Sequence, residues 1–273
     1  MVRVAAVQLD IVLGDPARNR DALVARADAT DAELIVFPEC SNSGYGFPDV
    51  DAARVHAEAV PGPTTDALQA VARARRRTIV VGLLERDGAA LFNAAAVLTP
   101  DGAVGKYRKV HLPFLGLDRF TSGGAAFPVF DTPVGRVGVQ ICYDLRFPEA
   151  SRSLALDGAE ILAVPTNWPR GAEAMPDHLV TARAVENRVF VVTANRVGAE
   201  GGAPFIGRSA VVDLRGSTLG ALGDRAGVLV AEIDPALARD KRAVHRPGEY
   251  EIDLFADRRP AAYGALTRPR RDA

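Results

Sequence analysis

The sequence predicts an α/β protein with the architecture of a four-layer α-β-β-α sandwich in a single domain. Three observations lead to this prediction: short apolar strands alternate with helical stretches, the same order of elements occurs twice, and 273 residues suit one large domain. A single doubly wound sheet is the alternative that the same alternation allows.

The first half of the chain has the pattern of parallel βαβ units, in which short apolar strands are separated by two helical stretches that begin at prolines. An Asp87-Gly88 turn precedes the last apolar run and Pro100-Asp101-Gly102 follows it, which indicates an antiparallel extension of the sheet. The predicted strands are 2–9, 34–37, 78–81 and 91–98, and the predicted helices are 16–29 and 63–76.

The second half repeats this order after an irregular stretch from residue 106 to residue 126. Residues 32–39 (AELIVFPE) and 159–166 (AEILAVPT) share one pattern at matching positions, which indicates a weak internal duplication. We therefore expect two related sheets that pack against each other, each with helices on its outer face. The predicted strands are 134–141, 161–164, 189–194 and 205–212, and the predicted helices are 148–156 and 176–187.

The domain is expected to cover residues 1–256. Residues 257–273 hold five arginines and two prolines with little periodicity. We expect this stretch to form a C-terminal arm on another subunit or a disordered tail.

Composition disfavours several classes of protein. The chain has 33 basic and 34 acidic residues, so it lacks the basic excess that binds nucleic acid or an anionic membrane. No apolar run approaches the ~20 residues that span a bilayer, and no leader segment is evident, so a cytoplasmic protein is expected. The two cysteines, Cys40 and Cys142, are too far apart for a C-x-x-C site.

Common motifs for other chemistries are missing from the sequence. It has no G-x-S-x-G elbow, no G-x-x-x-x-G-K-[ST] loop, no G-x-G-x-x-G opening a helix and no H-E-x-x-H pair. We therefore predict no cofactor and no metal.

Reactive side chains lie just after predicted strands, in the segments 37–40 (FPEC), 107–113 (YRKVHLP) and 141–149 (ICYDLRFPE). Ligands bind at the carboxyl ends of strands in α/β sheets, where loops converge. Cys142 is a candidate nucleophile, although a single cysteine is often an inert core residue. Glu39 is a candidate base, or else a helix cap or salt-bridge partner. Lys109 is one of only three lysines, and its compact ammonium suits a developing oxyanion.

Together these segments resemble the Glu, Lys and Cys signatures of the carbon–nitrogen hydrolase (nitrilase) superfamily. The similarity runs from about residue 2 to residue 263 and includes the stretches 165–169 (PTNWP) and 183–187 (RAVEN). It implies the α-β-β-α sandwich, metal-free thiol catalysis on a non-peptide C–N bond, and a homodimer formed through the helix after the nucleophile and the C-terminal arm. It also implies Glu39 as general base, Lys109 as transition-state cation and Cys142 as nucleophile.

The sequence departs from the family pattern at one point. Many members carry a second glutamate between the lysine and the cysteine, but no Glu occurs between Lys109 and Cys142. Asp118 is the only carboxylate in the corresponding part of that loop. It either takes the place of the glutamate or forms a surface salt bridge with Arg119.

Other residues are expected to surround the reacting atoms. Tyr143 contributes a backbone N–H to the oxyanion, and the pocket walls are expected to include Tyr45, Phe47, Asn167 and Trp168, although a single Trp is also a common packing residue. Cys40 is expected to be structural. A supporting charge network is expected to involve Arg183, Glu186 and Arg188.

The predicted function is a cysteine-dependent amidohydrolase that releases ammonia from a small linear amide or N-carbamoyl amine through a thioester. A nitrilase and a catalytically silent binding member are the alternatives. The context of Cys142-Tyr143-Asp144 and the stretch 165–168 resemble the amide-hydrolysing branches, whereas true nitrilases more often carry Cys-Trp-Glu. A rival catalytic arrangement pairs Cys142 with a histidine, for which His111 and His178 are the candidates.

Overall fold

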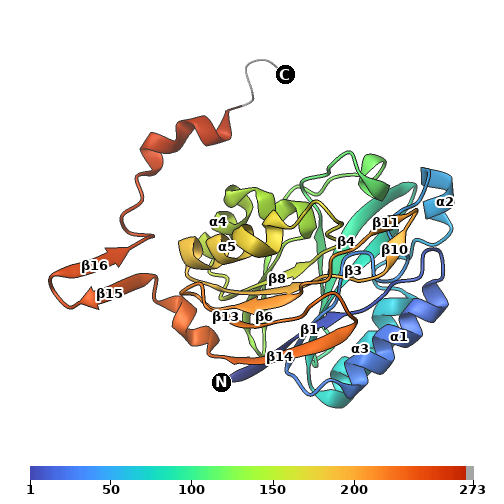
Figure 1. The fold of residues 1–273 in the computed structure, drawn as a ribbon, viewed down its shortest axis with the longest axis horizontal. Coiled ribbons are helices and arrows are strands. Elements are labelled where there is room, and N and C mark those ends of the chain that lie inside the picture. Colours follow the sequence, from blue (N-terminus) through green and yellow to red (C-terminus); the bar gives the residue numbers. More distant parts are fainter. Residues whose placement is uncertain (269–273) are drawn as a thin grey trace. The chain divides into compact units, whose positions relative to one another are not determined.

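The computed structural model describes residues 1–268 and forms two compact units (Figure 1). The first unit is Met1–Arg239, and the second begins at Asp240. The boundary that the sequence suggested, between residues 256 and 257, therefore falls inside the second unit. Among residues 1–268, no helix is long and apolar enough to cross a membrane.

The first sheet of the large unit has six strands in the order β14-β1-β2-β3-β4-β5. Strands β1, β2 and β3 are parallel, and β4, β5 and β14 extend the sheet in antiparallel fashion. Helices α1 (Pro16–Ala29) and α3 (Pro63–Arg75) lie together against this sheet (Figure 1), and a short helix α2 spans Val50–Arg54. The strands are β1 (Val2–Gln8), β2 (Leu34–Val36), β3 (Thr78–Asp87), β4 (Ala90–Leu98), β5 (Val104–Arg108) and β14 (Gly227–Ile233).

The second sheet repeats this pairing pattern in the order β13-β12-β9-β8-β7-β6. Strands β7, β8 and β9 are parallel, and the others are antiparallel to their neighbours. When the second sheet is followed from β6 to β13, its neighbouring strands pair in the same sequence of parallel and antiparallel contacts as those of the first sheet followed from β14 to β5. The internal duplication predicted two such related sheets. The strands are β6 (Val129–Thr132), β7 (Gly135–Val139), β8 (Ile161–Pro165), β9 (Phe190–Ala194), β12 (Ala210–Val212) and β13 (Thr218–Ala221).

Shorter elements complete the large unit. Helices α4 (Pro148–Leu156) and α5 (Val180–Asn187) cover the second sheet on the side away from α1 and α3 (Figure 1). The remaining elements are the hairpin β10 (Ala199–Glu200) and β11 (Ala203–Pro204), the π-turn η3 (Met175–Leu179), and the 3-10 turns η1 (Gly116–Arg119), η2 (Cys142–Arg146) and η4 (Pro235–Arg239).

Side-chain alternation along the strands separates two apolar layers. Residues Val4 and Val36 of the first sheet pack with Val139 and Ile161 of the second in a core between the sheets. The intervening residues point the other way, so that Ala5 and Ile35 join the buried faces of α1 and α3 in a second core. The chain therefore forms the predicted α-β-β-α sandwich.

Most predicted helices and strands are present, and the differences have local causes. The predicted strand 205–212 begins only at Ala210, because Gly207 and Arg208 both adopt positive φ near 63° and their N–H groups bond to neighbouring loops. Part of the stretch predicted as irregular forms β5, an edge strand whose polar side chains hide the apolar pattern. The return of the chain to the first sheet through β14 was not predicted.

The second unit is small. Strands β15 (Arg242–Arg246) and β16 (Tyr250–Asp253) form an antiparallel hairpin in which the rings of His245 and Tyr250 stack at 4.5 Å. The 3-10 helix η5 spans Pro260–Thr267. Residues 269–273 of the predicted arm lie outside the described residues.

Candidate active site

Glu39 follows β2 and is fully buried. The chain that carries it runs along β3: the N–H of Phe37 donates to Val80, and the N–H of Ser41 donates to Gly82. Gly82 permits this approach, because a Cβ atom there would lie 2.5 Å from both the Cα of Glu39 and the carbonyl oxygen of Pro38. The backbone of β3 thus fixes the position of the carboxylate.

Lys109 follows β5, and its ammonium is buried between two carboxylates. Its Nζ lies 2.8 Å from Oε1 of Glu39 and 2.5 Å from Oδ2 of Asp118. Both carboxylates are almost completely buried, as is the lysine itself. The structure therefore brings together Glu39, Lys109 and Asp118 from three separate segments.

Asp118 does not pair with Arg119, so the surface salt-bridge alternative is wrong. The Arg119 guanidinium donates instead to the backbone oxygens of Gly116, Phe47 and Pro48. The carboxylate of Asp118 points inward and also accepts a hydrogen bond of 2.9 Å from the hydroxyl of Tyr45.

Asn93 on β4 connects the two carboxylates, and sequence reasoning missed it. Its Nδ2 donates to Oε1 of Glu39 at 2.7 Å and to Oδ1 of Asp118 at 2.8 Å. The side chain is fully buried in a strand that is otherwise apolar. A single amide in the run LFNAAAVL was the signal that could have identified it, because buried amides need hydrogen-bond partners.

The buried cluster changes the pKa values of its members. Burial raises the pKa of Glu39, although the positive charge of Lys109 opposes this. Burial alone would lower the pKa of Lys109, but the charges of Glu39 and Asp118 raise it well above its ordinary value. Lys109 is therefore a permanent cation in this site.

Cys142 is the first residue of η2, directly after the segment that continues β7. Its φ of 47° is in the left-handed region, which is uncommon for a residue other than glycine. Cys142 is a partly exposed residue, whereas Cys40 is fully buried. Burial and the charge of Glu39 raise the pKa of Cys142 to about 12, whereas Lys109 and the Thr166 hydroxyl lower it.

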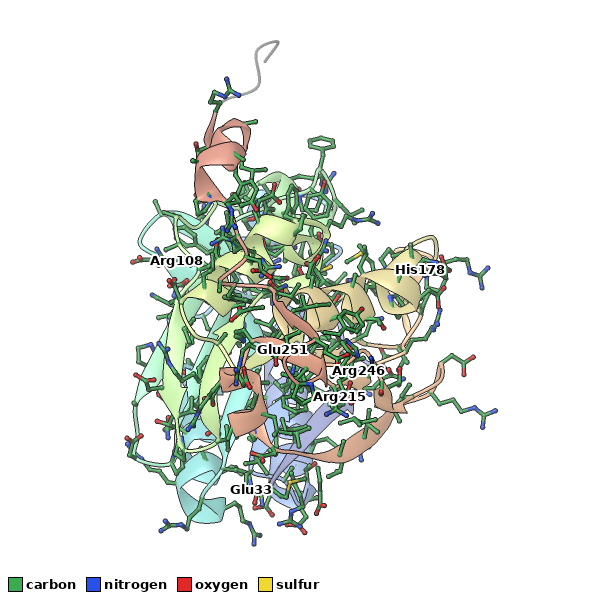
Figure 2. All side chains as sticks on the ribbon, turned by 90° about the vertical axis from the view of Figure 1, so that its left-hand side faces the viewer. Glu33, Arg108, His178, Arg215, Arg246 and Glu251 are labelled. Atoms are coloured by element: carbon green, nitrogen blue, oxygen red, sulfur yellow. The ribbon has the colours of Figure 1, made fainter. Side chains whose placement is uncertain are left out.

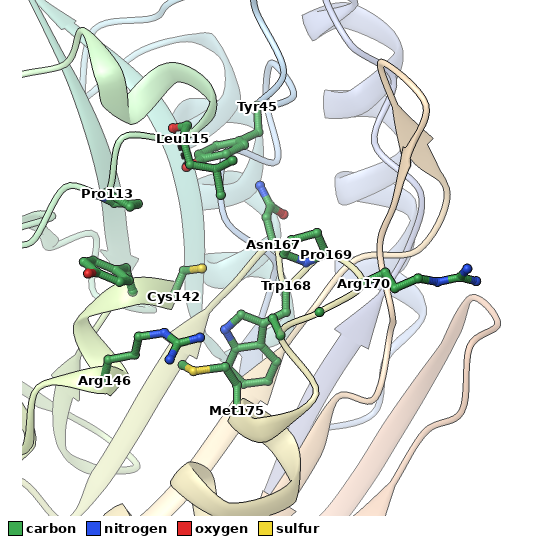
Figure 3. A pocket seen from close by; sticks show the side chains of 13 residues that line it. Tyr45, Pro113, Leu115, Cys142, Arg146, Asn167, Trp168, Pro169, Arg170 and Met175 are labelled. Atoms are coloured by element: carbon green, nitrogen blue, oxygen red, sulfur yellow. Dashed lines mark hydrogen bonds between the residues drawn. The ribbon is translucent and has the colours of Figure 1, made fainter.

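A cavity of about 280 Å³ opens over Cys142 (Figure 3). Three of the four predicted wall residues line it, namely Tyr45, Asn167 and Trp168, and Tyr143 lines it as well. Phe47 does not line this cavity; it stacks on His56 at 5.5 Å, within the apolar cluster that includes Tyr45. The other lining residues are Pro113, Leu115, Arg146, Pro169, Arg170, Gly171, Ala172 and Met175.

Several buried polar atoms of the predicted site residues have no hydrogen-bond partner among residues 1–268. They are Oε2 of Glu39, both side-chain amide atoms of Asn167, and Nε1 of Trp168. Such atoms are costly to bury alone. Asn167 and Trp168 belong to the residues that line the cavity, whereas Glu39 lies buried outside the lining.

Arg146, the last residue of η2, is a second residue that sequence reasoning missed. Its side chain is directed into the cavity, whereas that of Arg170 is directed away (Figure 3). No hydrogen bond or ion pair of its guanidinium is present in the described part of the chain. The lining residues include no carboxylate that could neutralise it. Its position four residues after Cys142 was the available signal.

The two histidines that were considered as partners of Cys142 lie elsewhere, one against Asp144 and Phe147 and the other at the surface. Nδ1 of His111 lies 2.8 Å from Oδ1 of Asp144, and its ring stacks on Phe147 at 3.6 Å. His178 is exposed at the surface of the large unit (Figure 2). Neither histidine lines the cavity over Cys142. Among residues 1–268, no group of His, Cys, Asp and Glu side chains could hold a metal ion.

Arg183 supports the turn that carries Cys142. Its guanidinium donates to the backbone oxygens of Leu145 at 3.0 Å and Arg146 at 3.2 Å, and it pairs with Glu186 at 3.1 Å. Two members of the predicted charge network thus contact each other behind η2.

Comparison with known proteins gives the same assignment. The family model for carbon-nitrogen hydrolase matches residues 3–243. A protein of Pyrococcus abyssi named nitrilase is 40% identical over 270 residues, covering 96% of this chain and 99% of the relative. A human protein named omega-amidase is 33% identical over 275 residues, covering 93% of this chain and 96% of the relative.

Solved structures agree with these relatives. The NitN amidase of Nesterenkonia sp. AN1 superposes with a TM-score of 0.80 at 29% identity, covering 97% of this chain and 100% of that chain. A Xanthomonas campestris protein of the CN-hydrolase superfamily, with an arsenic adduct in its active site, superposes with a TM-score of 0.79 at 30% identity, covering 88% and 93%. This chain therefore belongs to the carbon–nitrogen hydrolase family and is a hydrolase of C–N bonds other than peptide bonds.

Proposed function

We propose that this protein is a cysteine-dependent amidohydrolase that converts a small linear amide into a carboxylic acid and ammonia. One observation carries the proposal: Lys109 is a buried cation held between Glu39 and Asp118, and its positive charge lowers the pKa of the Cys142 thiol against the effects of burial and Glu39. An acceptor, a cation and a sulfur nucleophile are the groups that acyl transfer from an amide requires.

Acylation begins with the neutral thiol, because the pKa of Cys142 is raised to about 12. Glu39 takes the thiol proton, and its Oε2 is the free acceptor since Oε1 is occupied by Lys109 and Asn93. The sulfur then adds to the amide carbon. The raised pKa of Glu39 suits it to hold this proton.

The tetrahedral intermediate carries a negative oxygen. The ammonium of Lys109 and the backbone N–H of Tyr143 stabilise it. Glu39 returns the proton to the nitrogen, the C–N bond breaks, and ammonia leaves. A thioester between the acyl group and Cys142 remains.

Hydrolysis of the thioester uses the same groups in reverse. Glu39, now ionised, takes a proton from a water molecule, and the resulting hydroxide adds to the thioester carbon. Collapse of this second intermediate breaks the C–S bond. Glu39 returns the proton to the sulfur, and the acid product leaves.

We further propose that the preferred amide carries a negative group at its far end. The guanidinium of Arg146 has no partner in the described residues and lines a cavity without a carboxylate. Cys142 and Arg146 are the first and last residues of η2, and both line the same cavity. An ω-amido acid carries an amide at one end for Cys142 and a carboxylate at the other for Arg146, and the human relative is named omega-amidase.

A nitrilase is the second candidate, because the relative from Pyrococcus abyssi bears that name. Addition of the thiol to a nitrile would use the same three residues. A silent binding protein is disfavoured by the place of Cys142 in the cavity lining and by the unpartnered Oε2 of Glu39.

The test is an ammonia-release assay with neutral amides, ω-amido acids, N-carbamoyl amines and nitriles. We expect turnover of at least one amide and no turnover by the Cys142→Ala variant. Cys40→Ala is the matched control, because that thiol is fully buried. Ammonia release by a folded Cys142→Ala protein would refute the proposal, and turnover of nitriles alone would establish the second candidate.

A further inference from the structure

Asp144 has a buried carboxylate that takes no part in the proposed mechanism. It lies two residues after Cys142 in η2 and has no exposed surface. Its carboxylate accepts four hydrogen bonds. Oδ2 accepts from the hydroxyl of Tyr107 at 2.6 Å and from the N–H of Ile141 at 3.0 Å. Oδ1 accepts from the backbone N–H of His111 at 3.0 Å and faces Nδ1 of the same residue at 2.8 Å.

One of these hydrogen bonds joins the two sides of the turn that carries the nucleophile, Cys142. The N–H of Ile141 donates to the Asp144 side chain, and the N–H of Asp144 donates to the carbonyl oxygen of Ile141 at 2.9 Å. This reciprocal pair brackets Cys142, whose φ of 47° is a conformation that a cysteine adopts only when its surroundings impose it. Asp144 therefore closes the turn that presents the sulfur.

The other three bonds reach a different part of the fold. Tyr107 and His111 lie two residues on either side of Lys109, and Tyr107 belongs to β5 of the first sheet. Cys142 follows β7 of the second sheet. A single carboxylate thus connects the segment that carries the nucleophile with the segment that carries the cation.

The network requires an ionised carboxylate. Three of its partners are donors, namely the Tyr107 hydroxyl and the backbone N–H groups of Ile141 and His111, and a carboxylate is an acceptor at both oxygens; Nδ1 of His111 donates too in the tautomer that carries its proton there. Burial and the charge of Asp144 raise the pKa of Tyr107, so the tyrosine hydroxyl stays protonated and donates. An asparagine at position 144 would turn an amide NH₂ toward a donor and would break at least one of the connections.

We propose that Asp144 is a positioning residue that fixes the sulfur of Cys142 relative to the ammonium of Lys109. The inference rests on the proposed function, since it assumes that these two groups act on the carbon and the oxygen of one substrate carbonyl. Asp144 does not touch the cavity. Its loss should therefore affect the rate of the chemical step more than substrate binding.

The test compares Asp144→Asn with Glu160→Gln. Glu160 is a matched control because it is also a buried carboxylate, accepting from the N–H of Arg136 at 3.1 Å and pairing with Arg239. It precedes β8, at the opposite end of the sheet from Cys142. Both variants should be less stable than the unaltered protein, but only Asp144→Asn should change the chemistry.

Two measurements separate positioning from stability. For Asp144→Asn we expect kcat to fall about 100-fold, the effect of a misplacement of about 1 Å, with KM changed less than about threefold. The second measurement is the pH dependence of alkylation of Cys142 by iodoacetamide, followed by mass spectrometry. It should shift in Asp144→Asn, because the thiol moves relative to the charges that set its pKa, and it should not shift in Glu160→Gln.

Tyr107→Phe provides a milder variant that removes one of the four bonds. We expect kcat of Tyr107→Phe to fall, but by less than kcat of Asp144→Asn. If Asp144→Asn does not fold, Tyr107→Phe serves as the test of the inference. Unchanged kcat and an unchanged alkylation profile would overturn the inference, and so would equal losses in Glu160→Gln. Activity in Cys142→Ala would refute the proposed function. The alkylation experiment needs no substrate, so it tests the present inference separately.

Discussion

The ammonium of Lys109 lies 2.5 Å from the carboxylate of Asp118, and both groups are buried. Glu39 contacts the same ammonium at 2.8 Å, so one cation faces two carboxylates. With both carboxylates ionised, this cluster carries a net negative charge next to the nucleophile. The charge of Glu39 helps to raise the pKa of Cys142, which keeps the thiol neutral until a base removes its proton.

Asp118 is expected to hold Lys109 in place as the missing glutamate would. Its replacement by asparagine removes a charge from the ammonium and places an NH₂ group among the donors Asn93, Lys109 and Tyr45. We expect kcat for Asp118→Asn to fall about 100-fold, because a displaced ammonium no longer reaches the oxyanion. The measurement is steady-state ammonia release.

The control for this prediction is Asp131→Asn, which changes an exposed carboxylate in β6. It should leave kcat unchanged. Activity of Asp118→Asn within about threefold of the unaltered protein would show that Glu39 alone positions Lys109.

Lys109 is also expected to stabilise the fold. Lys109→Ala leaves two buried carboxylates facing each other without a cation, which costs about 3–5 kcal/mol of unfolding free energy. Adding Asp118→Asn to Lys109→Ala should restore part of this loss, because one of the like charges is removed. Urea unfolding of the single and double variants measures both effects. Additive losses in the double variant would contradict the prediction.

The raised pKa of Cys142 predicts a loss of stability at alkaline pH. The folded state holds the thiol proton up to about pH 12, whereas an unfolded cysteine loses it near pH 8.5. Folding therefore takes up a proton between these values, and the unfolding free energy falls as pH rises, by up to about 1.4 kcal/mol per pH unit.

Cys142→Ser isolates this contribution, because a serine does not titrate in this range while Cys40 remains in both proteins. We expect the unfolding free energy of the serine variant to decline less steeply between about pH 9 and pH 10.5. Parallel curves for the two proteins would show that the thiol titrates normally.

The position of the reactive groups could be predicted because they lie at strand ends. Glu39 follows β2 and Cys142 comes after β7, so each lies at the carboxyl end of a parallel strand in its own sheet, which is where ligands bind in α/β sheets. The internal repeat between residues 32–39 and 159–166 likewise predicted two sheets with equal strand directions. In both cases a short sequence pattern was enough, because regular strands fix where the residues that follow them lie.

Asn93 and Arg146 could not be predicted in the same way. Asn93 lies within β4, and it is the pairing of β4 with β3 on one side and with β5 on the other that places it beside both Glu39 and Lys109. The direction of the Arg146 side chain depends on how η2 packs beside the loop that carries Trp168. Phe47 was assigned to the pocket wall from its position near Tyr45, but its ring packs against His56 instead.

Arg146 leads to the most specific prediction about substrate choice. A guanidinium that binds a carboxylate through two charged hydrogen bonds contributes about 1.5–3 kcal/mol, so Arg146→Gln should raise KM for an ω-amido acid about 10- to 100-fold. A neutral amide of the same length should be affected little, since it offers no anion. Arg170→Gln is the control, because that side chain lines the same cavity but is directed away from it (Figure 3). The comparison requires kcat/KM for both amides with all three proteins, and an equal effect of Arg146→Gln on the charged and the neutral amide would show that Arg146 shapes the cavity without recognising charge.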